Sequence, residues 1–461
     1  MKNNKVILVG AGVVNLVSAY FLSRQGYELV IVDKAPPPHQ KQDWKNFGCT
    51  FGGENVRMFS YTEADNYNEK GSQLYSRMDL ALSKCIDKGG WLVNEPLHFS
   101  DLERSWIEDF HRVDPHDAIN FCEDIYSINI ASGAIWDQLM EEDSPLFEDV
   151  ELRKDIFRIY SDPADFQAAQ QLHGKLGSLI HAFDKKEVLA KYPMLRASEH
   201  AEQLGGCMLV QGFTLKVHTL CENILNYLVK KGTEIRWNTS FSGIEKDHAG
   251  QVTGVVIDGK LESYDHYLLS LGAYAGTTLL NTQTHNQLHG VLGVWLTLPN
   301  LYPELQHSMK IHKTGHVGED TNVTLIERGG KPVLVLGSGY GYTGNSSNNY
   351  VDNEQLTGLY DSLKETARVY FPEAYAQAAP YLDDTQKYCV RSWTPTGLGV
   401  FEMIPSDTGG KLIITGGNNT GGFTQAPQIA EAVVNALDGL PHRMHACFHP
   451  QRVKSPSGQI N

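Results

Sequence analysis

The stretch Val6–Lys34, VILVGAGVVNLVSAYFLSRQGYELVIVDK, decides the fold predicted for this chain. It opens with an unbroken apolar run, Val6–Val9, which is typical of a strand buried on both faces of a parallel sheet. Gly10 and Gly12 follow at once, so the backbone can turn tightly and approach a ligand closely. Apolar residues then recur at helical spacing as far as Gly26, and a second apolar strand follows. The stretch therefore predicts a βαβ unit whose helix begins directly after a glycine turn.

Asp33 and the helix N-terminus of this unit indicate a dinucleotide site. Asp33 ends the second strand about 20 residues after Gly12, where a carboxylate can accept a hydrogen bond from a ribose hydroxyl. The helix N-terminus offers free N–H groups and a positive dipole to a pyrophosphate. Asn15 stands in place of the third glycine of the G-x-G-x-x-G pattern, which implies a wider helix–strand crossing or a local side-chain hydrogen bond. A βαβ unit that binds nothing is the alternative, but strand, turn, helix, strand and acid occur in the order that the site requires.

Length and composition limit the class of protein. A chain of 461 residues suggests two to three structural domains, and 41% hydrophobic with 20% charged residues is ordinary for a soluble globular protein. The net charge of −15 argues against a nucleic-acid partner and against adhesion to an anionic membrane. The apolar start is too interrupted by glycine and polar residues for a signal or transmembrane segment. Seven scattered cysteines without a C-x-x-C pair indicate reduced thiols in a cytoplasmic protein, not a disulfide framework or a zinc site.

A second strand, glycine loop and helix occur near the C-terminus. The apolar strand Lys411–Thr415 leads into Gly416–Gly422, and a helix is predicted over Pro427–Leu437. This arrangement again directs a helix N-terminus at an anionic group. Two such elements suit one extended ligand better than two separate ligands, and FAD has that length. After Pro441 several histidines occur in what we expect to be a mobile tail, with no metal site.

The middle of the chain predicts helices and antiparallel strands. Ala118–Met140 is expected to be one long amphipathic helix, and Phe166–Leu195 is expected to be helical throughout. An apolar strand follows Gly290, and Gly293 within it indicates a bulge or a close backbone approach. Gly337–Tyr350 is predicted to be a polar, aromatic loop that is either a lid or a turn.

Six motifs, in order along the chain, resemble those of the FAD-dependent D-amino-acid oxidase superfamily, which includes glycine oxidase, sarcosine oxidase and D-amino-acid dehydrogenases. They are GAGVVN with VIVDK at the start, EVLAKYPML (187–195), GFTLKVHTL (212–220), YLLSLGAYAG (267–276), CVRSWTPTG (389–397) and TGGNNTGGFTQAPQIAEAVV (415–434). Residues from about 95 to 160 resemble the family least.

The resemblance implies an α/β fold in which a Rossmann-type FAD-binding domain joins an α+β substrate domain with a mainly antiparallel sheet. The FAD-binding domain would comprise residues 1–95, 212–282 and 388–445. The substrate domain would comprise 96–211 and 283–387, and 446–461 would form the tail.

The activity implied is oxidation of an amino acid or related amine: a hydride passes from the C–H beside nitrogen to flavin N5, and the imine then hydrolyses. Oxygen or another electron acceptor would reoxidise the flavin. Three alternatives stay open. They are an FAD-dependent 2-hydroxy-acid dehydrogenase, a flavin-bearing subunit that needs a partner protein, and an NAD-dependent dehydrogenase. Substrate, stereochemistry and oligomeric state are not determined by the sequence.

Three residues acquire specific roles from the resemblance. Arg391 matches the family arginine that looks like a bidentate clamp for a substrate carboxylate, although a structural ion pair is the alternative and Ser392 and Thr396 beside it depart from the family pattern. Arg57 matches a cation that would stabilise reduced flavin, or it is structural. Cys389 falls where some members tether FAD covalently, and a buried thiol is the alternative.

The glycine-rich loop around Thr50 either lies against the flavin ring or merely connects two elements. The residues expected to contact FAD are Gly10, Gly12, Asn15, Asp33, Lys34, Thr50, Gly272, Cys389, Gly416, Gly417, Thr420, Gly421, Gly422 and Phe423.

Overall fold

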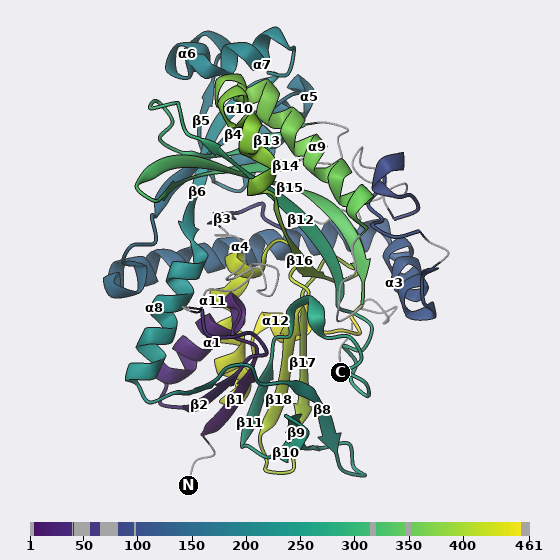
Figure 1. The fold of residues 1–461 in the computed structure, drawn as a ribbon. Helices are drawn as coiled ribbons and strands as arrows, with labels where there is room; N and C mark the ends of the chain where they lie inside the picture. The colour runs from purple at the N-terminus through teal and green to yellow at the C-terminus, as the bar shows by residue number, and fades with distance from the viewer. Residues whose placement is uncertain are drawn as a thin grey trace.

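The structure, a computed structural model, describes residues 4–38, 40, 56–64, 82–95, 98–313, 320–345 and 352–452. The described residues form two main sheets, one below the other in Figure 1, with helices packed on both. N-terminal, middle and C-terminal segments build the lower sheet, and the segments between them build most of the upper sheet. The predicted fold class, with a Rossmann-type unit and a mainly antiparallel second sheet, is confirmed.

The lower sheet has six strands among the described residues and is parallel except for one edge strand. In spatial order its strands are β17 (Val400–Pro405), β18 (Lys411–Gly416), β11 (His266–Leu269), β1 (Lys5–Val9), β2 (Glu28–Val32) and β7 (Glu234–Arg236). Helix α1 (Val13–Arg24) joins β1 to β2, which pair in parallel, so the predicted βαβ unit is confirmed.

The two faces of the lower sheet are covered differently. Val6 and Leu8 of β1 belong to a core shared with helices, whereas Ile7 and Val9 belong to a core shared with a small sheet. This alternation is why the strand is apolar at every position. The helices are α1, α4 (Pro115–Glu142), α8 (Val217–Lys230), α11 (Gly422–Leu437) and α12 (Arg443–Cys447), and the small sheet is β10 (Lys260–Glu262), β9 (Val252–Ile257) and β8 (Phe241–Lys246).

The upper sheet is antiparallel apart from one parallel pair, β4 with β13. In order its strands are β16 (Lys387–Trp393), β12 (His289–Pro299), β15 (Lys331–Gly344), β14 (Asp320–Arg328), β13 (Ser308–His312), β4 (Arg153–Tyr160), β6 (Gly206–Lys216) and β3 (Val56–Ser60), and β5 (Leu179–Phe183) also pairs with β6. Its helices are α3 (Asp101–Arg112), α5 (Pro163–Lys175), α6 (Lys185–Lys191), α7 (Arg196–His200), α9 (Asn353–Tyr370) and α10 (Pro372–Ala378). Short 3₁₀ helices are η2 (Ile86–Lys88), η4 (Ser144–Phe147), η5 (Pro193–Leu195), η6 (Gly272–Tyr274) and η7 (Ala379–Thr385).

Several predicted elements differ from the observed ones. Residues 166–195 are not helical throughout, because Gly177, with a positive φ, ends the turn after α5 and β5 then pairs with β6. Residues 337–344 continue strand β15 and are not a loop. Helix α11 begins at Gly422, five residues before the predicted start at Pro427.

The predicted tail begins inside the packed structure. Helix α12 ends at Cys447, and both Cys447 and Phe448 are buried. The Phe401 N–H of β17 donates to the Phe448 carbonyl at 2.7 Å, so the packed chain reaches beyond residue 446.

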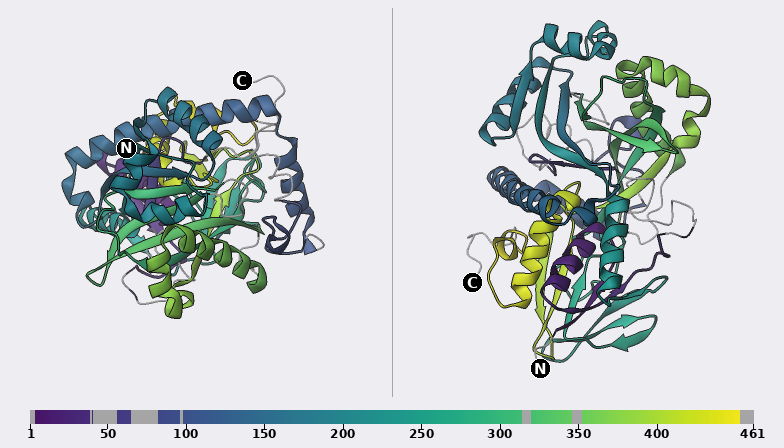
Figure 2. Two further views of the ribbon diagram at one scale, coloured as in Figure 1. Left: turned by 90° about the horizontal axis from the view of Figure 1, so that it is seen from above. Right: turned by 90° about the vertical axis from the view of Figure 1, so that its left-hand side faces the viewer.

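Helix α4 lies where the two sheets meet. The right-hand view of Figure 2 shows it, in blue, between the upper sheet and the helices of the lower one. Its residues Phe121, Ile125 and Trp136 share a core with α1 and α11. The sequence assigns this segment to the substrate domain, and the domain limits stay a prediction. No helix within the described ranges is both long enough and apolar enough to span a membrane.

Candidate functional site

The carboxyl ends of four parallel strands meet at the edge of the lower sheet that faces the upper one (Figure 1). Gly10 follows β1, Asp33 follows β2, Gly272 follows β11 and Gly416 ends β18. Ligands of open α/β sheets bind at this edge. The structure thus brings together residues that are far apart in sequence and that the sequence predicts to share one ligand.

The glycine turn after β1 is closely packed. Gly10 has φ +99°, and a Cβ there would lie 2.4 Å from the carbonyl oxygen of Ser270. Asn15 donates from Nδ2 to the carbonyls of Val9 and Gly10, both at 2.8 Å. The local hydrogen bond that we considered for Asn15 is therefore present. Gly12 is the N-cap of α1 and has no side chain, which leaves the helix N-terminus open to a phosphate.

Asp33 is positioned by backbone donors. Its two carboxylate oxygens accept from the N–H groups of Ala11 at 2.5 Å and Ala35 at 2.7 Å. Burial raises the pKa of Asp33, although these two N–H groups oppose the shift. Each oxygen keeps a lone pair for a ribose hydroxyl. Beside it, the Lys34 ammonium lies 3.6 Å from the centre of the Tyr274 ring, and burial lowers the pKa of this lysine.

The second glycine loop lies next to the first. A Cβ on Gly422 would lie 3.7 Å from the Val14 side chain, so the N-termini of α1 and α11 are neighbours. Gly421 is also close to Ala64, which follows β3. Two adjacent helix N-termini suit the pyrophosphate and the flavin end of one FAD molecule.

Hydrogen bonds explain the two departures from the family pattern after Arg391. The Ser392 hydroxyl accepts from the Gly417 N–H at 3.2 Å, and Thr396 Oγ1 accepts from the Leu398 N–H at 3.3 Å. Asn419, with φ 51°, donates from Nδ2 to the Gly397 carbonyl at 2.7 Å. The segment that carries Arg391 is therefore fastened to the glycine loop.

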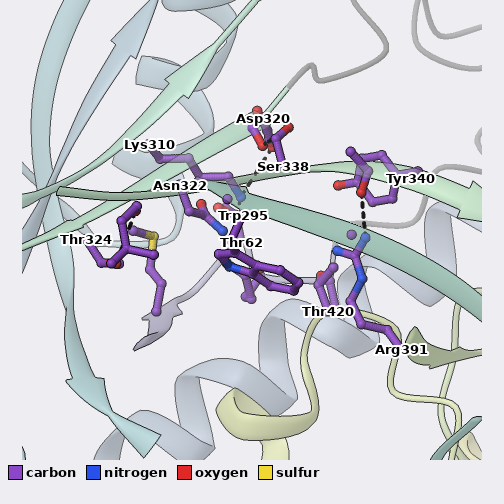
Figure 3. A pocket seen from close by; sticks show the side chains of 17 residues that line it. Thr62, Trp295, Lys310, Asp320, Asn322, Thr324, Ser338, Tyr340, Arg391 and Thr420 are labelled. Atoms are coloured by element: carbon purple, nitrogen blue, oxygen red, sulfur yellow. Dashed lines mark hydrogen bonds and ion pairs between the residues drawn. The ribbon is translucent and has the colours of Figure 1, made fainter. Parts of the chain in front are cut away.

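The pocket spans the concave face of the upper sheet. It is lined by residues of β3, β12, β13, β14, β15 and β16, by the turn 62–64 and by Thr420 of the glycine loop (Figure 3). Because Thr420 and Ala64 line it, the pocket opens onto the predicted flavin site.

Arg391 is held at one end of this pocket. Its Nη2 donates to the carbonyls of Leu292 at 2.9 Å and Gly339 at 2.6 Å, and its guanidinium carbon lies 4.9 Å from the centre of the Tyr340 ring. A Cβ on Gly293 would lie 2.7 Å from Arg391 Nη2, and the β12–β15 register shifts between Leu292 and Val294. The close approach and the bulge considered for Gly293 are thus both present. No carboxylate among the described residues pairs with Arg391.

The other end of the pocket holds charges that the sequence did not indicate. Lys310 Nζ lies 3.3 Å from Asp320 Oδ2 and 3.7 Å from Glu63 Oε2. His312 is 2.7 Å from Asp320 Oδ1. Burial opposes ionisation of Asp320, but Lys310 and His312 outweigh it and hold the pKa of this carboxyl well below its ordinary value.

The remaining residues predicted to contact FAD or the substrate differ in where they lie relative to the site. The Phe423 side chain is buried in the core, where its ring centre lies 5.0 Å from that of Trp136. Cys389 is buried on β16, where it pairs with Gly293. Arg57 lies on β3 opposite Leu215, but its side chain is outside the described part of the structure, as is Thr50. No group of histidine, cysteine, aspartate and glutamate suited to a metal occurs among the described residues.

Comparison with known proteins identifies the family. The model of the DAO family, FAD dependent oxidoreductase, matches residues 5–436. A D-amino acid dehydrogenase of Xanthobacter autotrophicus is 20% identical over 454 residues, which cover 94% of this chain and 95% of that protein. Glycine oxidase from Geobacillus kaustophilus superposes with a TM-score of 0.60 at 14% identity over 97% of this chain and 98% of the other. A modified fructosyl peptide oxidase from Aspergillus nidulans superposes with a TM-score of 0.60 at 15% identity, over 97% of this chain and 93% of the other.

The chain therefore belongs to the DAO family of FAD-dependent oxidoreductases. The predictions of an enzyme, of an oxidoreductase and of FAD as its cofactor are confirmed. The solved structures are similar in fold, and the comparisons cover nearly the whole chain.

Proposed function

We propose that this enzyme oxidises an amino acid or a related amine at the carbon beside nitrogen. The observation that carries the proposal is Arg391, a guanidinium without a carboxylate partner among the described residues, at the end of a pocket that adjoins the FAD loop. The relatives named above, a D-amino acid dehydrogenase and a glycine oxidase, support amine substrates rather than 2-hydroxy acids.

The residues of the chain have separable roles in this proposal. Asp33 and the N-termini of α1 and α11 hold FAD, which supplies the hydride acceptor when bound. Three backbone carbonyls, which accept from Nε and Nη2, and the Tyr340 ring fix the Arg391 guanidinium. The two N–H groups of Nη1 are left to bind a substrate carboxylate. Cys389 is a packing thiol in this proposal; acid precipitation of the protein would then release a yellow supernatant.

Location and electron acceptor belong to the proposal as well. No disulfide joins the described cysteines, which supports a cytoplasmic protein. The acceptor is oxygen or another redox partner, and oxygen consumption during turnover separates the two.

Replacement of Arg391 tests the carboxylate clamp. We expect Arg391→Ala to raise the KM for the best amino acid by the equivalent of about 2–5 kcal/mol, because a buried charged partner is lost. Arg391→Lys should recover part of this loss, and the amide of the same amino acid should be a poor substrate for every variant. Arg112→Ala, at an exposed ion pair on α3, is the control. An unchanged KM in Arg391→Ala would contradict the assignment.

A further inference from the structure

Strand register places one row of side chains across the pocket. Arg158 on β4 pairs with Lys310 on β13, and Lys310 pairs with Asn322 on β14. The row continues through Gly337 on β15 to Trp295 on β12. Cross-strand partners point to the same face of a sheet, so these side chains share the pocket face. Figure 3 shows Lys310 and Asn322 on one side of the pocket and Arg391 on the other.

Four strand-to-strand steps separate Lys310 on β13 from Arg391 on β16, which is about 19 Å between strand axes along the sheet. Long side chains reach inward from both ends. The pocket is therefore elongated across the strands, with a polar group at each end.

The end opposite Arg391 contains hydrogen-bond acceptors without donors. Glu63 is only 5% exposed, and its Oε2 has no hydrogen-bond partner among the described residues; the Lys310 ammonium is 3.7 Å away. Asn322 Oδ1 is likewise buried without a partner among those residues. Both residues line the pocket. A buried acceptor that lacks a donor is costly, so this end is suited to a ligand that donates hydrogen bonds.

The charges at this end favour a cation. Two carboxylates, Glu63 and Asp320, line the pocket here with one ammonium, Lys310. Behind them, Arg158 donates to Thr62 and Tyr160, and Asp165 lies 3.5 Å from His312. Asp320 lies close to both His312 and Lys310, whereas the Glu63 carboxylate has only Lys310, at 3.7 Å, among the described side chains. Glu63 is therefore the carboxylate left to pair with a positive charge on the ligand.

We propose that Glu63 and Asn322 bind a second, protonated amine of the substrate while Arg391 binds its carboxylate. This inference rests on the proposed function and narrows the substrate class to amino acids with a cationic group distant from the carboxylate. Glu63 and Asn322 are then specificity-determining residues.

Binding to the FAD-loaded enzyme under anaerobic conditions tests the inference. The probes are a homologous series of ω-amino acids and the alkanoates of the same chain lengths, with dissociation constants measured by calorimetry. At the best chain length we expect the ω-amino acid to bind at least about tenfold more tightly than the alkanoate, since a hydrogen bond to a charged group is worth that much. Glu63→Gln and Asn322→Leu should each reduce this ratio without changing alkanoate affinity, and Glu187→Gln, at an exposed ion pair on α6, should leave it unchanged.

Each other outcome contradicts the inference. Equal affinity for both series would show that no amine is bound at this end. Loss of affinity for both series in Glu63→Gln, or loss of FAD from that variant, would show that Glu63 maintains the pocket or the flavin site instead of binding an amine. Reduction of the flavin by lysine and norleucine, measured in parallel, reports on the proposed function separately. If both amino acids reduce the flavin but lysine has no advantage over norleucine, the proposed function stands and the second amine site does not.

Discussion

Asn15 stabilises the glycine turn at the single-residue scale. Its amide donates to the carbonyls of Val9 and Gly10, each at 2.8 Å, at the point where the FAD pyrophosphate is expected. Asn15→Leu keeps a side chain branched at the same carbon and removes both donors, so we expect the free energy of unfolding to fall by about 1–3 kcal/mol and FAD to bind more weakly. Urea unfolding and FAD titration measure the two effects. The exposed Asn226→Leu on α8 is the control, and an unchanged FAD affinity in Asn15→Leu would contradict this role.

The sequence predicted single residues where a motif fixes the geometry. Asp33 and Arg391 each have a defined place in a pattern, and both lie at the site. Glu63, Lys310 and Asn322 were missed because their proximity depends on sheet register. A signal existed, since polar residues alternate with apolar ones at Lys310 with His312 and at Asn322 with Thr324. Alternation identifies one face of a strand, but it does not show which strands are neighbours.

At the scale of elements, α3 is attached to the upper sheet through aromatic side chains. The Trp106 ring stacks on the His289 ring, with 5.1 Å between the ring centres, and Trp106 Nε1 donates to the Gln287 carbonyl at 3.0 Å. Asn286 Nδ2 donates to the Leu102 carbonyl, so its Oδ1 faces His289 Nε2 at 2.8 Å. His289 Nε2 must therefore carry the proton, and Nδ1 accepts from the Tyr342 hydroxyl at 2.8 Å.

The attachment of α3 predicts a pH dependence of stability. Burial, with a smaller contribution from His285, lowers the pKa of His289 from 6.5 to about 3. The unfolded chain therefore binds a proton that the folded chain does not, and the free energy of unfolding should decrease as pH falls from 6.5 toward about 3. In His289→Gln the free energy of unfolding should fall less steeply with decreasing pH over this range, by up to about 1.4 kcal/mol per pH unit.

Urea unfolding across this pH range measures the slope. His442→Gln is the comparison, because burial lowers the pKa of His442 only to about 4 and its effect should end there. If the wild type and His289→Gln have equal slopes, His289 does not stay neutral in the folded protein.

Element prediction failed where glycine and aromatic residues were taken as loop signals. Strand β15 contains Gly337, Gly339 and Gly341, which suggested a loop. In the structure a Cβ on Gly337 would meet the Trp295 indole at 2.5 Å, and one on Gly341 would meet Val93 at 2.7 Å. These glycines make room for side chains of neighbouring elements. Such contacts between distant segments are absent from any local pattern.

For the whole molecule, we expect FAD to connect segments from both ends of the chain. Because FAD binds the folded protein, we expect its removal to lower the thermal unfolding temperature. Free FAD at about 100 times its Kd should raise the free energy of unfolding by about 2.7 kcal/mol. Differential scanning calorimetry of the stripped and reloaded protein measures this. Asp33→Ala should require far more FAD for the same gain. Equal unfolding temperatures with and without FAD would contradict the joint site.

At this scale the ordered motifs predicted the Rossmann-type sheet and the mainly antiparallel sheet, and the discontinuous FAD-binding domain stays a prediction. It did not predict the position of α4 or the strand order of the upper sheet. Both depend on packing between segments such as β4 and β13, which pair in parallel although all the strands from β5 to β12 lie between them in sequence.

The most direct test of the central claim is an absorption spectrum of the purified protein before and after anaerobic addition of amino acids. Separate pools of D-amino acids, L-amino acids and N-methyl amines should be compared with a pool of 2-hydroxy acids. We predict flavin bands that bleach with one amine pool and persist with the hydroxy acids. A flavin that only the hydroxy acids bleach, or a colourless protein that does not take up added FAD, would contradict the account.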